Sequence, residues 1–188
     1  MDILTLGIHR FWKKTLMRRV NPTANTNLID MASGTGDIAI QFLEYIKNNN
    51  AEKDSHVTVC DINPHMLEVG KKRVKALNYN PKLITWLEAD GGNLPLENDS
   101  FNAYTISLAF HACTNILKWS FDLYSYIMLA FTHVLYGQWQ PYRHLVKNIQ
   151  EFPSKETLKV MIEEAGFQNV TYENLLFGVA TIHSGVKL

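Results

Sequence analysis

The chain has 188 residues, which is long enough for one compact domain with a sizeable core. Its 18 Lys and Arg balance 18 Asp and Glu, so the composition lacks the basic surplus of nucleic-acid-binding domains. Two cysteines, Cys60 and Cys113, are too few for a disulfide framework and suit a reducing compartment. No apolar run is long enough to span a bilayer, and no Pro/Gly/Ser-rich linker divides the chain. We therefore expect a single domain over residues 1–188 and no nucleic-acid partner.

The first twenty residues admit two interpretations. Basic side chains outnumber the single acid, Asp2, which is typical of an organelle presequence. The same stretch also predicts a structural helix, because its apolar residues recur at helical spacing. We favour the helix, whose core-facing side chains would be Ile8, Phe11, Trp12 and Leu16.

From Asn27 onward, strand patterns alternate with helix patterns. Strands are expected over residues 27–32, 57–61, 83–87 and 103–108. A helix follows the first strand, with an apolar stripe formed by Ile38, Phe42, Leu43 and Ile46. A second helix begins at Pro64, with Asn63 as its N-cap, and runs to about Leu77. This alternation predicts an α/β fold with a doubly wound, mostly parallel sheet.

The C-terminal residues follow a different pattern. Ser154 can cap a helix that ends at Gly166, and its apolar positions are Leu158, Met161, Ile162 and Ala165. Two short β-like runs follow, over residues 170–176 and 179–183. They predict a terminal antiparallel hairpin.

One connection is too short for the usual fold. The stretch between Leu108 and the helical run near Phe121 cannot hold both a crossover helix and a parallel strand, which together need roughly 30 residues. We therefore expect the sheet to lack one central strand.

The segment from Asp30 to Asp37 carries the chemistry. An apolar run ends in an acid, a loop of small residues follows, and then an amphipathic helix begins. Such a turn lets backbone N–H groups approach a ligand at a helix N-terminus. Asp61 closes the next apolar run, where its carboxylate can accept hydrogen bonds from both hydroxyls of a ribose. Together these features predict a nucleotide-type cofactor site.

Two cofactor classes fit this loop. Gly34-x-Gly36-x-x-Ala39 matches the dinucleotide fingerprint, so an NAD(P)-dependent oxidoreductase is one alternative. Three features favour S-adenosylmethionine. Asp30, at the end of the first strand, can interact with the amino group of that cofactor. Asp90-Gly91, after the third strand, can offer a carboxylate to the adenine amine and a backbone N–H to its ring nitrogen. The terminal hairpin, lastly, is more typical of methyltransferases than of dehydrogenases.

The chain as a whole resembles the ubiquinone/menaquinone biosynthesis C-methyltransferases, which are class I S-adenosylmethionine enzymes with a Rossmann-like fold. The stretches that carry the resemblance include Leu6-Gly7-Ile8-His9-Arg10, Asp30–Ile38, Val59-Cys60-Asp61-Ile62-Asn63, Tyr104-Thr105-Ile106-Ser107, Phe152-Pro153-Ser154 and Ile182-His183-Ser184-Gly185. The Val-Cys-Asp-Ile-Asn and Ile-His-Ser-Gly segments are similar to those of the mitochondrial branch of this family. Residue 33 departs from the family, since Ser33 stands where a glycine is usual.

This resemblance implies a site, a reaction and a location. The cofactor residues would be Gly34, Thr35, Gly36, Asp61, Asp90 and Gly91. The reaction would move a methyl group from the sulfonium to a ring carbon of a polyprenyl benzoquinol intermediate of ubiquinone biosynthesis. The location would be the matrix side of the mitochondrial inner membrane, with peripheral membrane contact and a ubiquinone-biosynthesis protein complex as partner.

The segment after the fourth strand departs from the family. Where the family reads Phe-Gly-Ile-Arg-Asn, this chain has Leu108-Ala109-Phe110-His111-Ala112, and the family's fifth strand is missing. His111 is the nearest candidate for the proton acceptor of the reaction, because imidazole titrates near neutral pH. The alternative is a histidine without a catalytic role, in an impaired S-adenosylmethionine-binding relative that acts in a biosynthetic complex. The other histidines show no metal-ligand spacing, so no metal site is expected.

Overall fold

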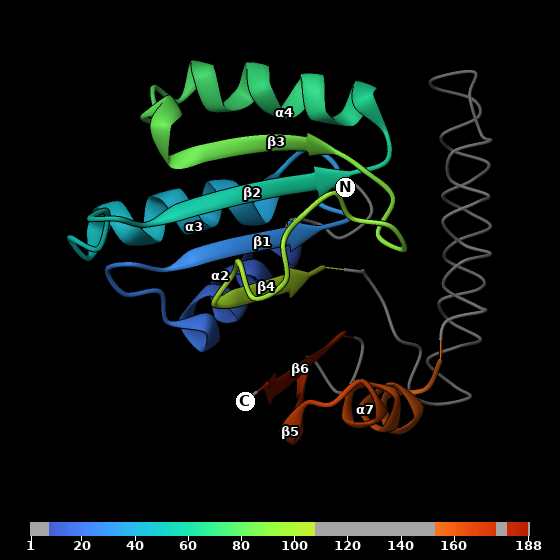
Figure 1. Cartoon of the computed structure of the whole chain (residues 1–188). Helices are drawn as coiled ribbons and strands as arrows, with labels where there is room; N and C mark the ends of the chain where they lie inside the picture. Colours follow the sequence, from blue (N-terminus) through green and yellow to red (C-terminus); the bar gives the residue numbers. More distant parts are fainter. Residues whose placement is uncertain (1–7, 108–152, 176–179, 188) are drawn as a thin grey trace, which may run out of the picture. The chain divides into compact units, whose positions relative to one another are not determined.

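The computed structural model describes residues 8–107, 153–175 and 180–187. They belong to two compact units, one built from residues 8–107 and the other from the C-terminal residues (Figure 1). The single domain over residues 1–188 stays a prediction, as does the loss of a central strand, which concerns residues 108–152.

Four parallel strands form the sheet of the first unit. They are β1 (Asn27–Met31), β2 (His56–Asp61), β3 (Ile84–Glu88) and β4 (Ala103–Ile106), arranged in the order β3-β2-β1-β4. Their bounds differ from the predicted ones by one or two residues. In the register, Asp30 pairs with Val59 on one side and with Thr105 on the other. All four strands run the same way, so the loops that follow them leave from one edge.

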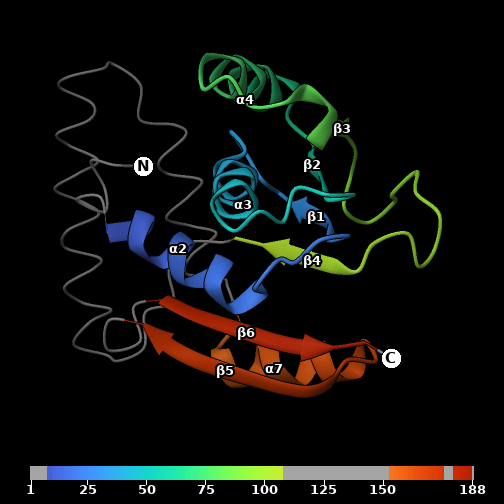
Figure 2. The same cartoon turned by 90° about the vertical axis from the view of Figure 1, so that its left-hand side faces the viewer.

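Three helices cover one face of this sheet. They are α2 (Ile8–Val20), α3 (Asp37–Asn48) and α4 (Pro64–Ala76), and a 3₁₀ turn, η1 (Pro81–Leu83), precedes β3. Figure 2 shows the three helices on one side of the strands and the loop between β3 and β4 on the other. The predicted stripe of α3 is fully buried against the strand side chains Leu28, Val57 and Val59. Each such aliphatic or aromatic side chain contributes about 1.5–3 kcal/mol by leaving water.

The helix α2 confirms the structural interpretation of the N-terminus, but its buried face is only partly the predicted one. Met17 is buried, and Leu16 and Val20 pack against the same core. Phe11, expected in the core, is 61% exposed. Adjacent residues of a helix point about 100° apart, so Phe11 turns outward once Leu16, Met17 and Val20 define the inner face.

The opposite face of the sheet has its own smaller core. Ile29, Met31 and Cys60 pack there against apolar residues from the end of β3 and the loop that follows it: Leu87, Ala89, Leu94, Leu96 and Phe101. Tyr104 and Ile106 of β4 are about half exposed within the described part of the chain. The loop between β3 and β4 therefore packs against the end of β1.

The C-terminal unit confirms the predicted helix and hairpin. In α7 (Lys155–Glu164), the Ser154 hydroxyl accepts a hydrogen bond from the Thr157 N–H at 3.1 Å. After α7, Gly166 adopts a φ of +89°, and the Phe167 N–H donates to the Ile162 carbonyl at 3.3 Å, which closes the helix end.

The hairpin consists of β5 (Gln168–Leu175) and β6 (Ala180–Val186), which pair antiparallel. It reaches further than predicted, since β6 continues to Val186. Gly185 permits this close pairing, because a Cβ there would lie 3.1 Å from Val170 Cγ2 and 3.3 Å from Phe167 Cβ. This close approach gives a structural reason for the glycine that ends Ile-His-Ser-Gly.

No helix within the described ranges combines the length and the apolar character needed to cross a bilayer.

Candidate functional site

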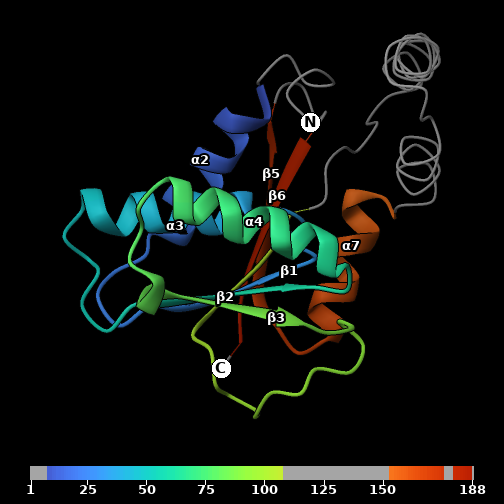
Figure 3. The ribbon, with the colours of Figure 1, turned by 90° about the horizontal axis from the view of Figure 1, so that it is seen from above.

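The glycine-rich loop joins the end of β1 to the start of α3 with an unusual backbone. Ala32, Gly34 and Gly36 all have positive φ, at 49°, 57° and 72°. The Gly36 N–H donates to the Ser33 carbonyl at 3.0 Å, and the Ser33 N–H donates to the Cys60 carbonyl at 3.2 Å. A Cβ added at Gly34 would meet no described atom within 4 Å, so the loop borders open space at that point. Figure 3 shows α3 and α4 starting at the ends of the strands that precede them.

Asp61 links this loop to the end of β2. Its Oδ2 accepts a hydrogen bond from the Gly34 N–H at 2.7 Å, and its Oδ1 accepts one from the Asn63 N–H at 2.8 Å. Each carboxylate oxygen has a second lone pair, so both can accept a further hydrogen bond. The structure therefore brings together Asp61 and the loop residues that the sequence singled out. It also shows that the carboxylate is already oriented by backbone N–H groups.

Asp30 is the penultimate residue of β1 and is fully buried. Its Oδ1 accepts a hydrogen bond from the Thr105 hydroxyl at 2.8 Å, while Oδ2 has no hydrogen-bond partner among the described residues. Burial raises the pKa of this carboxyl to about 7, although the Thr105 hydrogen bond and the charge of Lys13 oppose the rise. A buried carboxylate with a free oxygen is costly without a cation beside it. Asp30 is thus suited to receive a cationic group.

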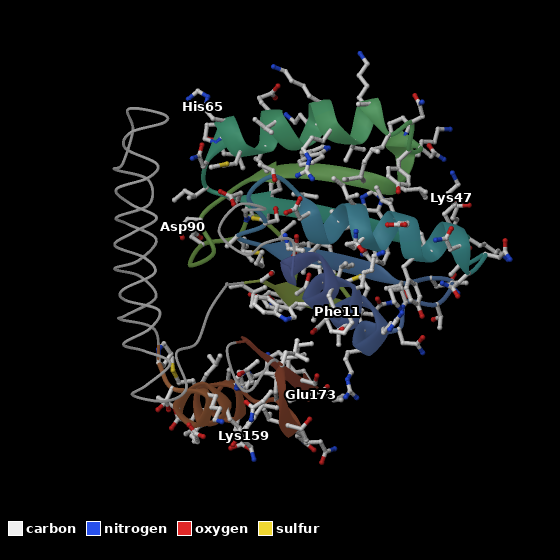
Figure 4. All side chains as sticks on the ribbon, turned by 180° about the vertical axis from the view of Figure 1, so that it is seen from behind. Phe11, Lys47, His65, Asp90, Lys159 and Glu173 are labelled. Atoms are coloured by element: carbon white, nitrogen blue, oxygen red, sulfur yellow. The ribbon has the colours of Figure 1, made fainter. Side chains whose placement is uncertain are left out.

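Asp90 and Gly91 lie in the loop after β3, at the same edge of the sheet. The Asp90 Oδ1 accepts from the Gly92 N–H at 3.0 Å, so the acid shapes its own turn. A Cβ at Gly91 would lie 3.3 Å from Met31 Cε, which places this turn against the last residue of β1. Figure 4 shows Asp90 at the same end of the sheet as His65, which lies at the start of α4. The acids predicted from the sequence therefore lie at or just beyond the carboxyl ends of three neighbouring strands.

Two cations that sequence reasoning missed hold the loop from the helix side. Lys13 Nζ of α2 lies 2.5 Å from Asp37 Oδ2, and Arg73 Nη1 of α4 lies 2.6 Å from Asp37 Oδ1. The same Arg73 nitrogen donates to the Thr35 hydroxyl at 2.6 Å and to the Thr35 carbonyl at 3.1 Å. Burial alone would raise the pKa of Asp37, but the hydrogen bonds and charges of Lys13 and Arg73 outweigh it and hold that pKa below its usual value. Helical spacing does not reveal these partners, since they come from separate helices.

A tryptophan ring of β3 also packs against the loop. A Cβ at Gly36 would lie 3.1 Å from the Trp86 ring, and a Cβ at Gly70 would lie 2.5 Å from it. The lack of a side chain at both glycines therefore lets the Trp86 ring pack against the loop and against α4. A glycine inside the predicted helix of residues 64–77 was the one sequence signal of this close approach.

The predicted catalytic residue lies outside the described residues. His111, together with the rest of the Leu108–Ala112 segment, remains a prediction from the sequence. In the part of the chain that the structure describes, His, Cys, Asp and Glu side chains form no group of three that could hold a metal ion.

The described residues suit a ligand that carries a cation at one end and hydroxyl groups in the middle. Asp30 offers a buried acceptor oxygen, Asp61 offers two oriented oxygens, and the space beside Gly34 is open. The Ser33 hydroxyl is also buried without a hydrogen-bond partner among the described residues. These unpartnered buried atoms lie at the loop that the sequence associates with a cofactor.

Comparison with known proteins gives consistent matches. The model of the ubiE/COQ5 methyltransferase family matches residues 1–118 and 109–187. The mitochondrial 2-methoxy-6-polyprenyl-1,4-benzoquinol methylase of Drosophila melanogaster is 40% identical, over all of this chain and 74% of its own length. The Homo sapiens protein of that name is 35% identical, over all of this chain and 75% of its own length.

Solved structures show the same fold. A SAM-dependent methyltransferase from Aquifex aeolicus superposes with a TM-score of 0.56 at 11% identity, over 87% of this chain and 83% of its own. The phosphoethanolamine N-methyltransferase 2 of Haemonchus contortus superposes with a TM-score of 0.57 at 16% identity, over 87% of this chain and 38% of its own.

Proposed function

The chain belongs to the ubiE/COQ5 methyltransferase family, and from this premise we propose that it methylates a ring carbon of a polyprenyl benzoquinol in ubiquinone biosynthesis. It is an S-adenosylmethionine-dependent methyltransferase by family and by fold. This decides against the alternative of an NAD(P)-dependent oxidoreductase. The benzoquinol substrate is supported by the names of relatives that span the whole chain.

The buried, half-partnered carboxylate of Asp30 is the observation that carries the cofactor site. We infer that Asp30 Oδ2 receives the ammonium group of S-adenosylmethionine, because a cation there offsets the cost of the buried charge. Ser33, whose hydroxyl is buried and unpartnered, adjoins the same end of the ligand. Asp61 accepts hydrogen bonds from the ribose hydroxyls, and its bond to the Gly34 N–H keeps it in place.

The loop after β3 completes the cofactor site. In this proposal Asp90 accepts a hydrogen bond from the adenine amine, and the Gly91 N–H donates to a ring nitrogen. Ile62 directly follows Asp61 and is 68% exposed, so it offers an apolar surface for the adenine ring. When bound, the cofactor supplies an electrophilic methyl group on a sulfonium. In this proposal Gly34, Thr35 and Gly36 lie beside the methionine part of the cofactor.

The protein contributes alignment and a proton acceptor. The ring carbon becomes nucleophilic when the neighbouring hydroxyl loses its proton, and we propose His111 as the group that takes this proton. The altered Leu108–Ala112 segment favours a second candidate function, an impaired relative that binds the cofactor within a biosynthetic complex.

The proposed location is the matrix side of the mitochondrial inner membrane, with peripheral contact to the membrane that dissolves a polyprenyl substrate. The word "mitochondrial" in the names of the relatives supports this proposal.

A turnover assay with the purified chain tests the function. The protein would be incubated with S-adenosylmethionine and a short-chain 2-methoxy-6-polyprenyl-1,4-benzoquinol, and the methylated product measured by mass spectrometry. A product one methyl group heavier, and its loss in His111→Ala, supports the proposal. Binding of S-adenosylhomocysteine without any product favours the impaired relative. Failure to bind either form of the cofactor contradicts both candidates.

A further inference from the structure

Three helices meet at one carboxylate beside the cofactor loop. Asp37 opens α3, and its two oxygens pair with Lys13 of α2 and Arg73 of α4. We call these three residues the Asp37 clamp. The arginine reaches beyond the ion pair, because its Nη1 also donates to the hydroxyl and the carbonyl of Thr35. The clamp therefore contacts the glycine-rich loop directly.

That loop needs restraint, because its backbone does not belong to a regular element. Positive φ values at Ala32, Gly34 and Gly36 exclude both helix and strand along this stretch. The bond from the Gly34 N–H to Asp61 fixes one side of the loop. Arg73 fixes the other side, because its side chain donates a hydrogen bond to the backbone carbonyl of Thr35.

Overall stability gains little from the Arg73 side of this cluster. The Arg73 side chain is 42% exposed, and ion pairs in contact with water contribute little to the free energy of folding. The consequence of the cluster is therefore local. It decides where Thr35 lies, and so which way the loop's backbone N–H and carbonyl groups point.

Asp37 also reduces the positive charge next to a cationic ligand. S-adenosylmethionine carries a sulfonium and an ammonium, so two uncompensated cations nearby would repel it. Asp37 contacts both Lys13 and Arg73, at 2.5 Å and 2.6 Å, and its charge offsets one of their two positive charges. The same lysine charge also acts on Asp30, which places α2 within electrostatic reach of the cofactor site.

We propose that Arg73 is a positioning residue, which holds Thr35 and the glycine-rich loop in the cofactor-binding conformation. Through Asp37, Lys13 makes the N-terminal helix α2 part of the same restraint, so the affinity for cofactor depends on α2. This inference rests on the proposed cofactor site at the loop.

A double-mutant cycle tests the inference. The dissociation constant of S-adenosylhomocysteine would be measured by titration calorimetry for the full chain and for Arg73→Ala, Thr35→Val and the double variant. Arg73→Ala is expected to weaken binding about tenfold, and the double variant to lose less affinity than the product of the two single effects, since the arginine acts through Thr35. Effects that multiply as for independent sites, or an unchanged affinity in Arg73→Ala, would overturn the proposal.

Controls separate positioning from general destabilisation. Lys75→Ala, on the same helix and exposed, is expected to leave the affinity within twofold of the wild type. Arg73→Lys keeps a positive charge beside Asp37 and is expected to retain part of the affinity that Arg73→Ala loses. It also provides a second measurement if Arg73→Ala folds poorly. Melting temperatures of all unliganded variants are expected to differ little. A loss of affinity that tracks the melting temperature, or one shared by Lys75→Ala, would overturn the positioning role.

Lys13→Ala tests the connection to α2. A several-fold loss of affinity is expected, and an unchanged affinity would overturn this part of the inference. If the wild type itself fails to bind S-adenosylhomocysteine, the proposed function fails. If the wild type binds and the Arg73 variants bind equally well, the clamp alone fails.

Discussion

Asp30 shows how a single buried group can favour function over stability. Its pKa rises from 3.8 to about 7 through burial, so the folded protein holds a proton on this carboxyl between about pH 4 and pH 7 while the unfolded chain releases it. The folded state then binds more protons than the unfolded state, and the free energy of unfolding falls as pH rises through this window.

We predict that Asp30→Asn removes this pH dependence. Between pH 5 and pH 8 the free energy of unfolding of the wild type should fall by about 2–3 kcal/mol more than that of the variant. This follows from about 1.36 kcal/mol per pH unit of the window. Urea unfolding at the two pH values measures this difference. Asp99→Asn, in the exposed loop before β4, is a control that should keep the wild-type profile. A wild-type pH profile in Asp30→Asn would show that the buried carboxyl is not its source.

Ala32 carries backbone strain at the start of the glycine-rich loop. Its φ of 49° places the backbone in the left-handed region, which costs roughly 1–2 kcal/mol for a residue with a Cβ. Ala32→Gly relieves this strain but costs about 0.4–1 kcal/mol through the greater entropy of the unfolded chain, so a net gain between zero and about 1.6 kcal/mol is predicted. Denaturant unfolding measures it, with Ala39→Gly in α3 as the opposite control. Equal destabilisation by both substitutions would contradict the account.

At the scale of elements, the packing of α4 against β3 depends on the absence of a side chain at Gly70. Alanine is the better helix former by about 1 kcal/mol, yet its Cβ would lie 2.5 Å from the Trp86 ring and 3.0 Å from the Thr35 carbonyl. We predict that Gly70→Ala lowers the free energy of unfolding by about 1–3 kcal/mol, because the ring must move. In a Trp86→Leu background the same substitution should cost less. A gain in stability in the wild-type background would mean that propensity outweighs packing.

The elements themselves could be predicted because their signals are local. The apolar stripe of α3 and the Asn63 N-cap, whose side chain accepts from the His65 N–H, fix two helices from neighbouring residues. The two sides of α2 were harder to assign, since the choice between Phe11 and Met17 depends on what the helix packs against. The Asp37 clamp and the Trp86 contact join separate elements, so no spacing in the sequence reveals them.

At the scale of the molecule, binding of cofactor should stabilise the fold. A ligand at one hundred times its dissociation constant adds about 2.7 kcal/mol, which for a chain of this size raises the melting temperature by roughly 5–10 °C. S-adenosylhomocysteine is expected to produce this shift, whereas NAD⁺ is expected to produce none. A thermal melt with each ligand measures it, and the reverse pattern would contradict the cofactor assignment.

The edge of the sheet that collects the acids could be predicted from chain order alone, because parallel strands place their carboxyl ends together. The proton acceptor could not be settled in this way. His111 falls in the segment where the sequence departs from its family, outside the residues that the structure describes.

A crystal structure of the chain with S-adenosylhomocysteine tests the central claim most directly. The account predicts one ligand at the carboxyl edge of the four-stranded sheet, with its amino group at Asp30, its ribose at Asp61 and its adenine beside Asp90. A ligand bound elsewhere, or one that leaves Asp30 and Asp61 without contact, would contradict it.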